Sequence, residues 1–182
     1  MENFVIISGC SGGGKSTLID KLAKWGLPVV PEPGRRIIAE EGSTGGSSLP
    51  WVNLEAFAAR AIALSLADRD KMRNVSGWVF FDRGLVDATA ALDHAAGTSN
   101  LTSLQDQHRY HRQVFLTPPW PEIYRQDDAR QHGFDEAVEE YGRLLIAYRT
   151  LGYDPVILPK TGVDHRASYI LERLHLPLER LP

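Results

Sequence analysis

Glycines, a lysine and two hydroxyl residues are concentrated in one short stretch near the start of the chain, which reads GCSGGGKST over residues 9–17. Four residues separate Gly9 from Gly14, and Lys15 and Ser16 follow at once, which satisfies the pattern G-x-x-x-x-G-K-[ST] without a mismatch. Such a loop curls so that consecutive backbone N–H groups face a phosphate, and residues without a β-carbon let the backbone come that close. The sequence therefore predicts a phosphate-binding loop.

The end of this loop combines residue types that hold a nucleotide and a metal ion. The start of a helix adds free N–H groups and partial positive charge, which favour a phosphate. Lys15 is expected to bridge the outer phosphates of ATP, and the Ser16 hydroxyl to ligate Mg²⁺. A glycine-rich turn that binds nothing is the alternative. The residues expected to bind ATP are Gly9, Ser11, Gly12, Gly13, Gly14, Lys15, Ser16 and Thr17.

An acidic residue closes a fully apolar run later in the chain. Asp82 follows residues 78–81, which read WVFF and are typical of a buried central strand. A carboxylate at this point of a phosphate-loop protein is placed to bind Mg²⁺, although many buried strands end in aspartate. Arg83 comes next and is expected to contact substrate or phosphate, with a surface ion pair as the alternative. Asp87 could assist Arg83.

Charged residues also follow the apolar run at residues 27–30. Glu32 is interpreted as a carboxylate that orients a substrate hydroxyl or accepts its proton, and an ordinary solvated turn is the alternative. Arg35 would hold the substrate or fix Glu32. Arg60, on a long predicted helix, could reach the substrate or be exposed. The predicted substrate-binding residues are Glu32, Arg35, Arg60 and Arg83.

A strongly charged segment, YRQDDAR at residues 124–130, follows the fourth predicted strand. Arg125 and Arg130 could belong to an ordinary charged helix face. In a phosphate-loop kinase, however, the segment after the fourth strand is where a mobile lid closes and delivers arginines to the transferring phosphate. The sequence favours such a lid at about residues 118–135. The predicted catalytic residues are Lys15, Glu32, Asp82, Arg83, Arg125 and Arg130.

Strand-like and helix-like segments alternate along the chain. Strands are expected at residues 3–8, 27–30, 78–81, 112–116 and 155–158, and helices at 15–25, 35–41, 53–73, 85–95, 134–151 and 163–174. Residues 42–50 are expected to form a flexible loop, and 100–109 to be part helical. This alternation predicts a single α/β domain over residues 1–182, with a five-stranded parallel sheet between two helical layers. Ligands of such sheets bind beyond the carboxyl ends of the strands.

Composition limits the remaining choices. The chain has 182 residues and a formal net charge of −3, so the sequence gives no support for binding to nucleic acid. Cys10 is the only cysteine, which excludes an internal disulfide and suggests the cytoplasm. No apolar run approaches membrane-spanning length, and no signal peptide is expected. A monomer or a homodimer is expected.

These motifs resemble the NadR-like P-loop ATPase/kinase family. The resemblance rests on the loop, the E-x-x-R element from Glu32 to Arg35, the FFDRG stretch at residues 80–84, and the YRQDDAR segment that runs into FDEA at 134–137. Relatives in this group phosphorylate nicotinamide riboside, and deoxynucleoside kinases share a Glu-Pro and an acid-Arg pair. The resemblance implies that Lys15 and Ser16 hold ATP and Mg²⁺, that Glu32 is a base or substrate anchor, that Asp82 and Arg83 serve metal and phosphate, and that Arg125 and Arg130 form the lid.

Three functions stay open at this point. The first is a kinase that transfers the ATP γ-phosphoryl group to a nucleoside, a nucleotide or a related small molecule. The second is a regulatory ATPase without such an acceptor, but the chain has no N-K-x-D element and no LSGGQ signature, and Arg83 stands where ring-forming ATPases commonly place a glutamate. The third is a nucleotide-binding module without turnover.

Overall fold

The strands form one sheet. A computed structural model describes residues 3–99, 101, 108–125 and 133–176. The strand order is β2-β3-β1-β4-β5, and every neighbouring pair is parallel. The strands are β1 (Phe4–Gly9), β2 (Val29–Val30), β3 (Val79–Asp82), β4 (Gln113–Thr117) and β5 (Asp154–Ile157). The prediction of a five-stranded parallel sheet is therefore confirmed.

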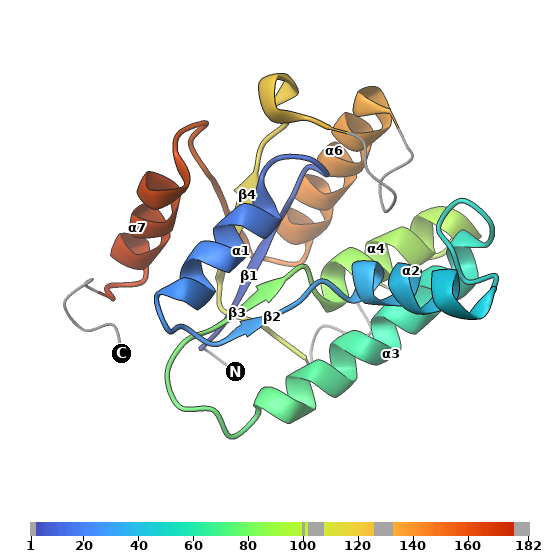
Figure 1. Ribbon diagram of the computed structural model, residues 1–182, viewed down its shortest axis with the longest axis horizontal. Helices are drawn as coiled ribbons and strands as arrows, with labels where there is room; N and C mark the ends of the chain where they lie inside the picture. Colours follow the sequence, from blue (N-terminus) through green and yellow to red (C-terminus); the bar gives the residue numbers. More distant parts are fainter. Residues whose placement is uncertain (1–2, 100, 102–107, 126–132, 177–182) are drawn as a thin grey trace.

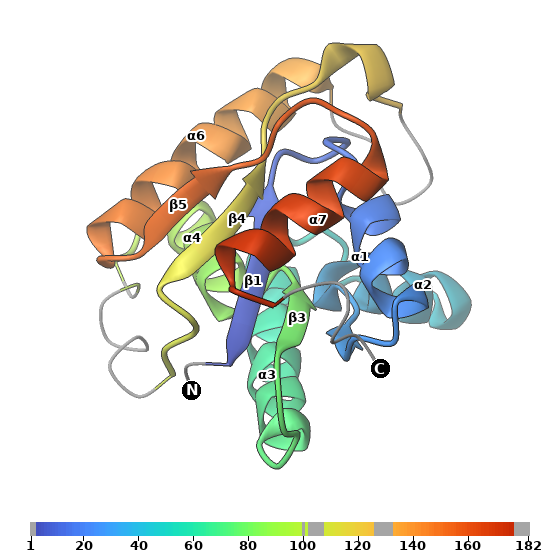
Figure 2. The same cartoon turned by 90° about the vertical axis from the view of Figure 1, so that its left-hand side faces the viewer.

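Helices cover both faces of this sheet, as an all-parallel sheet requires. They are α1 (Lys15–Lys24), α2 (Pro33–Thr44), α3 (Leu54–Met72), α4 (Leu85–Ala96), α6 (Phe134–Thr150) and α7 (Val163–Arg173), with a short 3₁₀ helix η1 (Pro121–Ile123). Figure 1 shows α1 and α7 on one side of the sheet, with α3, α4 and α6 on the other. Figure 2 shows α1 and α7 side by side across the front of the strands. The predicted three-layer α/β/α arrangement is thus present.

The central strand divides its side chains between two hydrophobic cores. Phe4 and Ile6 of β1 pack with residues of α4 and α6 on one face, whereas Val5 and Ile7 pack with residues of α1 and α7 on the other. All four of these side chains are fully buried. Successive side chains of a strand point to opposite faces, so an apolar run without alternation requires cover on both sides.

Helix α2 begins earlier and ends later than the sequence predicts. It starts at Pro33, because proline suits the first turn of a helix, where no N–H partner is required. It continues to Thr44 and ends at Gly45, whose φ of 69° lies in the left-handed region that glycine favours at helix ends. The predicted loop at residues 42–50 is therefore wrong in its first three residues. The part-helical stretch predicted at 100–109 lies largely outside the described residues.

The carboxyl ends of the strands lie at one edge of the sheet. The loop after β1, the start of α2 after β2, and Arg83 after β3 are brought together there, although they are far apart in sequence. Parallel strands align in this way because they all run in the same direction. Among the described residues, no helix has the length and apolar character needed to cross a membrane.

Candidate functional site

The phosphate loop leaves β1 at a point where only glycine fits. Gly9 has a φ of 112°, and a β-carbon there would lie 2.3 Å from the carbonyl oxygen of Thr117 on β4. The next residue, Cys10, donates its backbone N–H to that same oxygen at 2.9 Å. The close approach of β1 and β4 therefore fixes where the loop begins and explains the first glycine of the motif.

The end of the loop presents free backbone donors. Gly14 has a φ of 81° and immediately precedes α1, and no side chain caps the helix. Within the described residues, the amides of Gly14, Lys15, Ser16 and Thr17 make no hydrogen bond. Four successive free N–H groups at the positive end of a helix dipole suit an anion such as a phosphate.

A cavity of about 1390 Å³ opens in front of these amides and is lined by residues of several elements. At one end, here called the phosphate-loop end, it is bounded by Ser11, Gly12, Gly14, Lys15, Ser16, Thr17, Trp120, Lys160, Thr161, Gly162, Val163 and Arg166. At the other, here called the α2–α4 end, it is bounded by Glu32, Arg35, Ile38, Pro50, Trp51, Leu54, Phe57, Ala58, Ala61, Ala88, Ala91 and His94. Single drug-sized ligands commonly occupy pockets of about 300–1,000 Å³, so this cavity has room for two small molecules.

Lys15 is buried beneath the loop. Its Nζ donates to the carbonyl oxygens of Gly9 at 3.3 Å and Cys10 at 3.0 Å. Burial lowers the pKa of Lys15, and the nearby cation of Arg83 lowers it further, whereas Asp82 and Glu32 act in the opposite direction. A buried ammonium group held by carbonyls gains from an anionic ligand.

Asp82 is suited to a metal ion. The residue is only 4% exposed, and its Oδ1 has no hydrogen-bond partner among the described residues. Burial, followed by the negative charge of Glu32, raises the pKa of Asp82 to about 7. The Ser16 hydroxyl is exposed to the cavity. Both residues offer the oxygen donors that Mg²⁺ prefers, but Asp82, unlike Ser16, is not among the residues that line the cavity.

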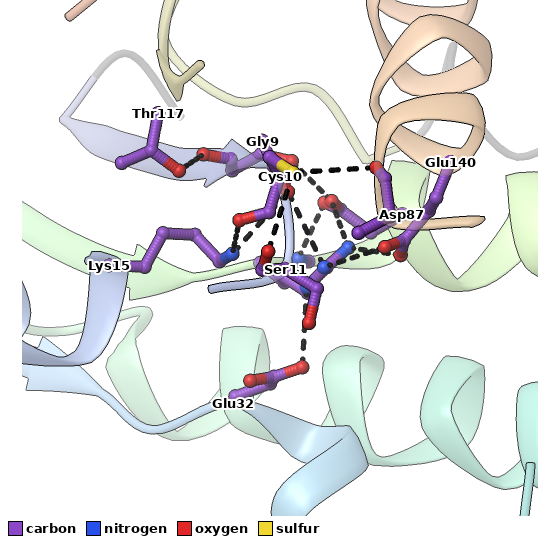
Figure 3. Close-up of polar contacts among 12 residues, drawn as sticks. Gly9, Cys10, Ser11, Lys15, Glu32, Asp87, Thr117 and Glu140 are labelled. Atoms are coloured by element: carbon purple, nitrogen blue, oxygen red, sulfur yellow. Dashed lines mark hydrogen bonds and ion pairs between the residues drawn. The ribbon is translucent and has the colours of Figure 1, made fainter. Parts of the chain in front are cut away.

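Arg83 is the centre of the charged part of the site. Its guanidinium reaches three carboxylates from three different elements, with Nε 3.2 Å from Glu32 Oε1, and Nη1 2.8 Å from Glu140 Oε1 and 3.5 Å from Asp87 Oδ1. Burial would lower the pKa of Arg83, but the charges of Glu140, Glu32 and Asp87 outweigh burial and hold this pKa well above its usual value. Figure 3 shows Glu32, Asp87 and Glu140 directed at one centre, with Lys15 approaching from the opposite side.

The backbone of Arg83 is itself unusual. Its φ is 61°, a left-handed conformation that residues other than glycine rarely adopt and that often occurs at functional sites. Its N–H donates to the carbonyl oxygen of Ile7 at 2.9 Å, which continues the β1–β3 pairing. This pairing and the three carboxylates hold the guanidinium over the cavity.

Asp87 fixes Arg83 from inside the protein. Its Oδ2 accepts hydrogen bonds from the Tyr148 hydroxyl at 2.6 Å and from the N–H of Gly84 at 3.0 Å. Its Oδ1 accepts from the Ser8 hydroxyl. Burial of Tyr148, followed by the negative charge of Asp87 and the hydrogen bond to it, raises the pKa of Tyr148 well above the usual range. Asp87 is therefore placed to assist Arg83, as the sequence suggested.

Glu140 was not predicted from the sequence. It lies on α6 and lines the cavity, one helical turn from the buried residues Ala137 and Leu144. An acidic residue on the buried stripe of an amphipathic helix is the signal that could have revealed it, because such a carboxylate needs a partner. Its partner, Arg83, is 57 residues away and could not be inferred from spacing.

Aromatic residues at the α2–α4 end were also missed. Trp51 and Phe57 line the cavity, although the sequence showed no aromatic pattern that would indicate a ring-binding pocket. Trp51 belongs to the loop before α3, and Phe57 to the first turn of α3. Glu32 and Arg35 stand at the same end, with Arg35 Nε 3.4 Å from Glu32 Oε2, so Arg35 is placed where it can fix Glu32.

Arg60 lies elsewhere, contrary to the expectation of a substrate contact. Its Nη2 is 2.7 Å from Glu40 Oε2, and its Nη1 pairs with the buried carboxylate of Glu41. Both carboxylates belong to α2 and face α3, which explains why the guanidinium turns toward them. Arg60 is not among the residues that line the cavity.

The lid stays a prediction. Residues 126–132, including Arg130, lie outside the described residues. Arg125 is exposed, donates through Nη1 to the carbonyl oxygen of Tyr124 at 2.7 Å, and does not line the cavity. Tyr124 packs against the ring of Phe134 with centroids 5.2 Å apart, and a β-carbon on Gly12 would lie 2.5 Å from its ring. The described start of this segment therefore contacts the phosphate loop.

The fold and the loop define the class of the protein as a P-loop NTPase with a nucleoside-kinase-like fold. A family described as an AAA domain matches residues 4–166, and the chain belongs to this family. No curated protein sequence matches the chain.

Solved structures share the fold at low sequence identity. Deoxyadenosine kinase from M. mycoides with bound dATP has a TM-score of 0.67 at 12% identity, covering 94% of this chain and 98% of that chain. NadR protein in complex with NR has a TM-score of 0.72 at 21% identity, covering 100% of this chain and 54% of that chain. NadR protein in complex with NAD and AMP-PNP has a TM-score of 0.68 at 18% identity, covering 100% of this chain and 52% of that chain. The chain thus spans about half the length of the NadR chains.

Proposed function

We propose that this protein is an ATP-dependent kinase that transfers the γ-phosphoryl group of ATP to a hydroxyl group of a nucleoside, a nucleotide or a related small metabolite. One observation carries the proposal: a single cavity joins the phosphate loop to a second, partly aromatic pocket, and Glu32 and Arg83 line it. A kinase needs room for a donor and an acceptor with charged groups near the point of transfer. The known ligands of the similar structures, dATP, NR and AMP-PNP, are consistent with this class.

The phosphate-loop end would bind the donor. The free amides of residues 14–17 would donate to the phosphate oxygens, and Lys15 would exchange its two carbonyl contacts for the outer phosphates. Ser16 and Asp82 would hold Mg²⁺, which, when bound, neutralises charge on the β- and γ-phosphates. Thr17 is exposed in the first turn of α1 and lines the cavity.

Glu32 would orient the acceptor and take its proton. In the transfer, the acceptor oxygen forms a bond to the γ-phosphorus while the bond from that phosphorus to the oxygen retained by ADP breaks. The hydroxyl proton passes to the Glu32 carboxylate. Arg83, which pairs with Glu32 at 3.2 Å, would hold this carboxylate and stabilise the charge on the transferring group.

An acceptor screen tests the proposal. Release of ADP is measured with a panel of nucleosides, nucleotides and related hydroxyl compounds, each with Mg-ATP. We expect one class of acceptor to raise ADP release sharply and to yield a phosphorylated product by mass spectrometry. Glu32→Gln should lose this stimulation, because the amide cannot accept the proton, whereas Glu172→Gln, an exposed position on α7, should retain it.

Two results would contradict the proposed kinase activity. Hydrolysis of ATP that ignores every acceptor would favour a regulatory ATPase. Binding of Mg-ATP without any turnover would favour a nucleotide-binding module.

A further inference from the structure

A buried arginine contacts the phosphate loop from the far end of the chain. Arg166, on α7, is only 5% exposed and lines the phosphate-loop end of the cavity. Its Nη1 donates to the carbonyl oxygens of Gly13 at 3.4 Å and Gly14 at 3.3 Å. Its guanidinium carbon lies 5.5 Å from the ring centroid of Trp120. The sequence offers no motif that singles out this residue.

Burial of this guanidinium is not balanced by a negative charge. Among the described residues, Arg166 forms no ion pair with a carboxylate, and its Nε has no hydrogen-bond partner. Burial lowers the pKa of Arg166. A buried cation without a carboxylate destabilises a fold, and the Trp120 ring and two carbonyls compensate only in part. Such an arrangement indicates a functional reason for placing the cation there.

The two carbonyls are informative because of peptide geometry. In a planar trans peptide, the C=O group and the following N–H group point in opposite directions. The Gly13 carbonyl shares its peptide with the amide of Gly14, and the Gly14 carbonyl shares its peptide with the amide of Lys15. A guanidinium that binds both carbonyls therefore turns both amides away from itself. These are two of the amides that make no hydrogen bond within the described residues.

The loop needs such a restraint. Glycines occupy three consecutive positions, 12–14, and those at 12 and 14 have φ values of 78° and 81°. Glycine loses more backbone freedom on ordering than any other residue, so an unrestrained loop would lose that entropy each time a ligand bound. Fixing the loop in advance removes this loss from the binding step.

We propose that Arg166 is a positioning residue that orients the Gly14 and Lys15 amides toward the donor phosphates before the nucleotide binds, and that the Trp120 ring holds its guanidinium. The inference rests on the proposed function, because the phosphates are those of the donor. It adds that the phosphate loop is completed by α7, about 150 residues further along the chain than the motif itself.

The test uses a ligand that has phosphates but neither base nor ribose. Binding of Mg-tripolyphosphate and of Mg-ATP is measured by calorimetry for the wild type, Arg166→Met and Arg166→Lys. Loss of a charge-assisted restraint should lower the affinity for both ligands by the same factor, about tenfold for Arg166→Met. The factor should be the same because the orientation of the amides does not depend on the base. Arg173→Met is the matched control, since Arg173 lies on the same helix over the ring of Tyr169 but is exposed.

A second readout separates orientation from direct contact. In the ligand-free protein, Arg166→Met should shift the ¹⁵N–¹H signals of Gly14 and Lys15, and Arg173→Met should leave them in place. If Arg166→Met does not fold, Trp120→Leu serves instead and should produce the same shifts and a smaller loss of affinity.

The outcomes distinguish the two proposals. A wild type that binds neither ligand would overturn the proposed function and this inference with it. A wild type that binds both, together with an Arg166→Met variant of unchanged affinity, would overturn this inference alone. The orienting role would also be overturned by a loss confined to ATP, which indicates a contact with the base, or by a loss without shifted signals, which indicates direct contact with a phosphate.

Discussion

The two ends of the cavity are built from different parts of the polypeptide. At the phosphate-loop end, the amides of consecutive residues 14–17 make no hydrogen bond within the described residues, and the loop and helix start lie within residues 9–17. At the α2–α4 end, the surface consists of side chains from α2, α3, α4 and the loop before α3. Figure 1 shows these helices lying apart from α1 and α7. Substitution of side chains changes little at a site formed by backbone groups, but it changes a site formed by side chains. Specificity for an acceptor would therefore be set at the α2–α4 end.

Arg83 lies where the two ends meet. Its three carboxylate partners come from the start of α2, from α4 and from α6, and its Nη2 also lies 3.4 Å from the carbonyl oxygen of Gly9 in the phosphate loop. The group that links the two ends is therefore a side chain rather than the backbone. If the two ends act separately and Arg83 couples them, changes at each end and at Arg83 should have different effects.

The largest effect is expected from Lys15→Ala. Removing the ammonium group eliminates a donor to the outer phosphates, so phosphoryl transfer should fall by about 10²–10³-fold or more. Nucleotide-dependent thermal stabilisation, measured by differential scanning fluorimetry, should disappear. Lys24→Ala, an exposed lysine in the last turn of the same helix, should behave like the wild type. Persistent stabilisation by Mg-ATP in Lys15→Ala would contradict the assignment of the phosphate loop.

The next effect is expected from Arg83→Gln, which removes the link between the two ends. The change leaves Glu32, Asp87 and Glu140 without their shared cation, and loss of one partner of a buried ion pair destabilises a protein by about 3–5 kcal/mol. Denaturant unfolding measures this loss. Adding Glu140→Gln should recover part of it, because one unpaired charge is then removed. Independent effects of the two changes would show that the carboxylates do not share Arg83.

A more selective effect is expected from Trp51→Ala at the α2–α4 end. Loss of an aromatic stacking surface weakens binding of a planar group by about 1–3 kcal/mol, so the KM for the best acceptor should rise about tenfold while the KM for ATP stays constant. Steady-state kinetics with each substrate varied in turn provides the measurement. Val52→Ala changes the neighbouring exposed residue, which does not line the cavity, and should leave both values unchanged. A parallel rise in the KM for ATP would show that the two ends are not separate.

The smallest effect is expected from the pH dependence of Asp82. Its pKa of about 7 lies above the value of 3.8 expected in the unfolded chain, so between these limits the native state binds more protons than the unfolded state. Without nucleotide, this group should therefore make the protein less stable as the pH rises from about 4 to 7. Asp82→Asn should remove this component, as seen in denaturant unfolding at several pH values.

The raised pKa of Asp82 also predicts that ligands at the two ends of the cavity differ in the protons that they release. A carboxylate must lose its proton to bind Mg²⁺, so uptake of Mg-ATP near pH 7 should release protons, and calorimetry in buffers of different ionisation enthalpy detects them. Binding of the acceptor alone should release none through Asp82. Equal proton release by both ligands would mean that Asp82 does not belong to the phosphate-loop end.

The sequence by itself determined the succession of strands and helices along the chain and where the phosphate loop begins. These features depend on local patterns: apolar runs that end in Asp82 or lead into Gly9, and helices with an apolar stripe such as the one from Phe134 to Thr150. The backbone groups of such a loop belong to consecutive residues, so the G-x-x-x-x-G-K-[ST] pattern can be recognised in the sequence without any knowledge of packing.

Only the tertiary structure decided which side chains meet in the cavity. Three side chains reach it from distant elements: Glu140 from α6, Trp51 from the loop before α3, and Arg166 from α7. Arg60 turns instead toward the carboxylates of α2. The partners in these contacts are up to about 150 residues apart, and a charged residue on a helix can face solvent, a neighbouring helix or a cavity with the same sequence pattern. The choice among these is made by the packing of helices on the sheet, which local spacing does not encode.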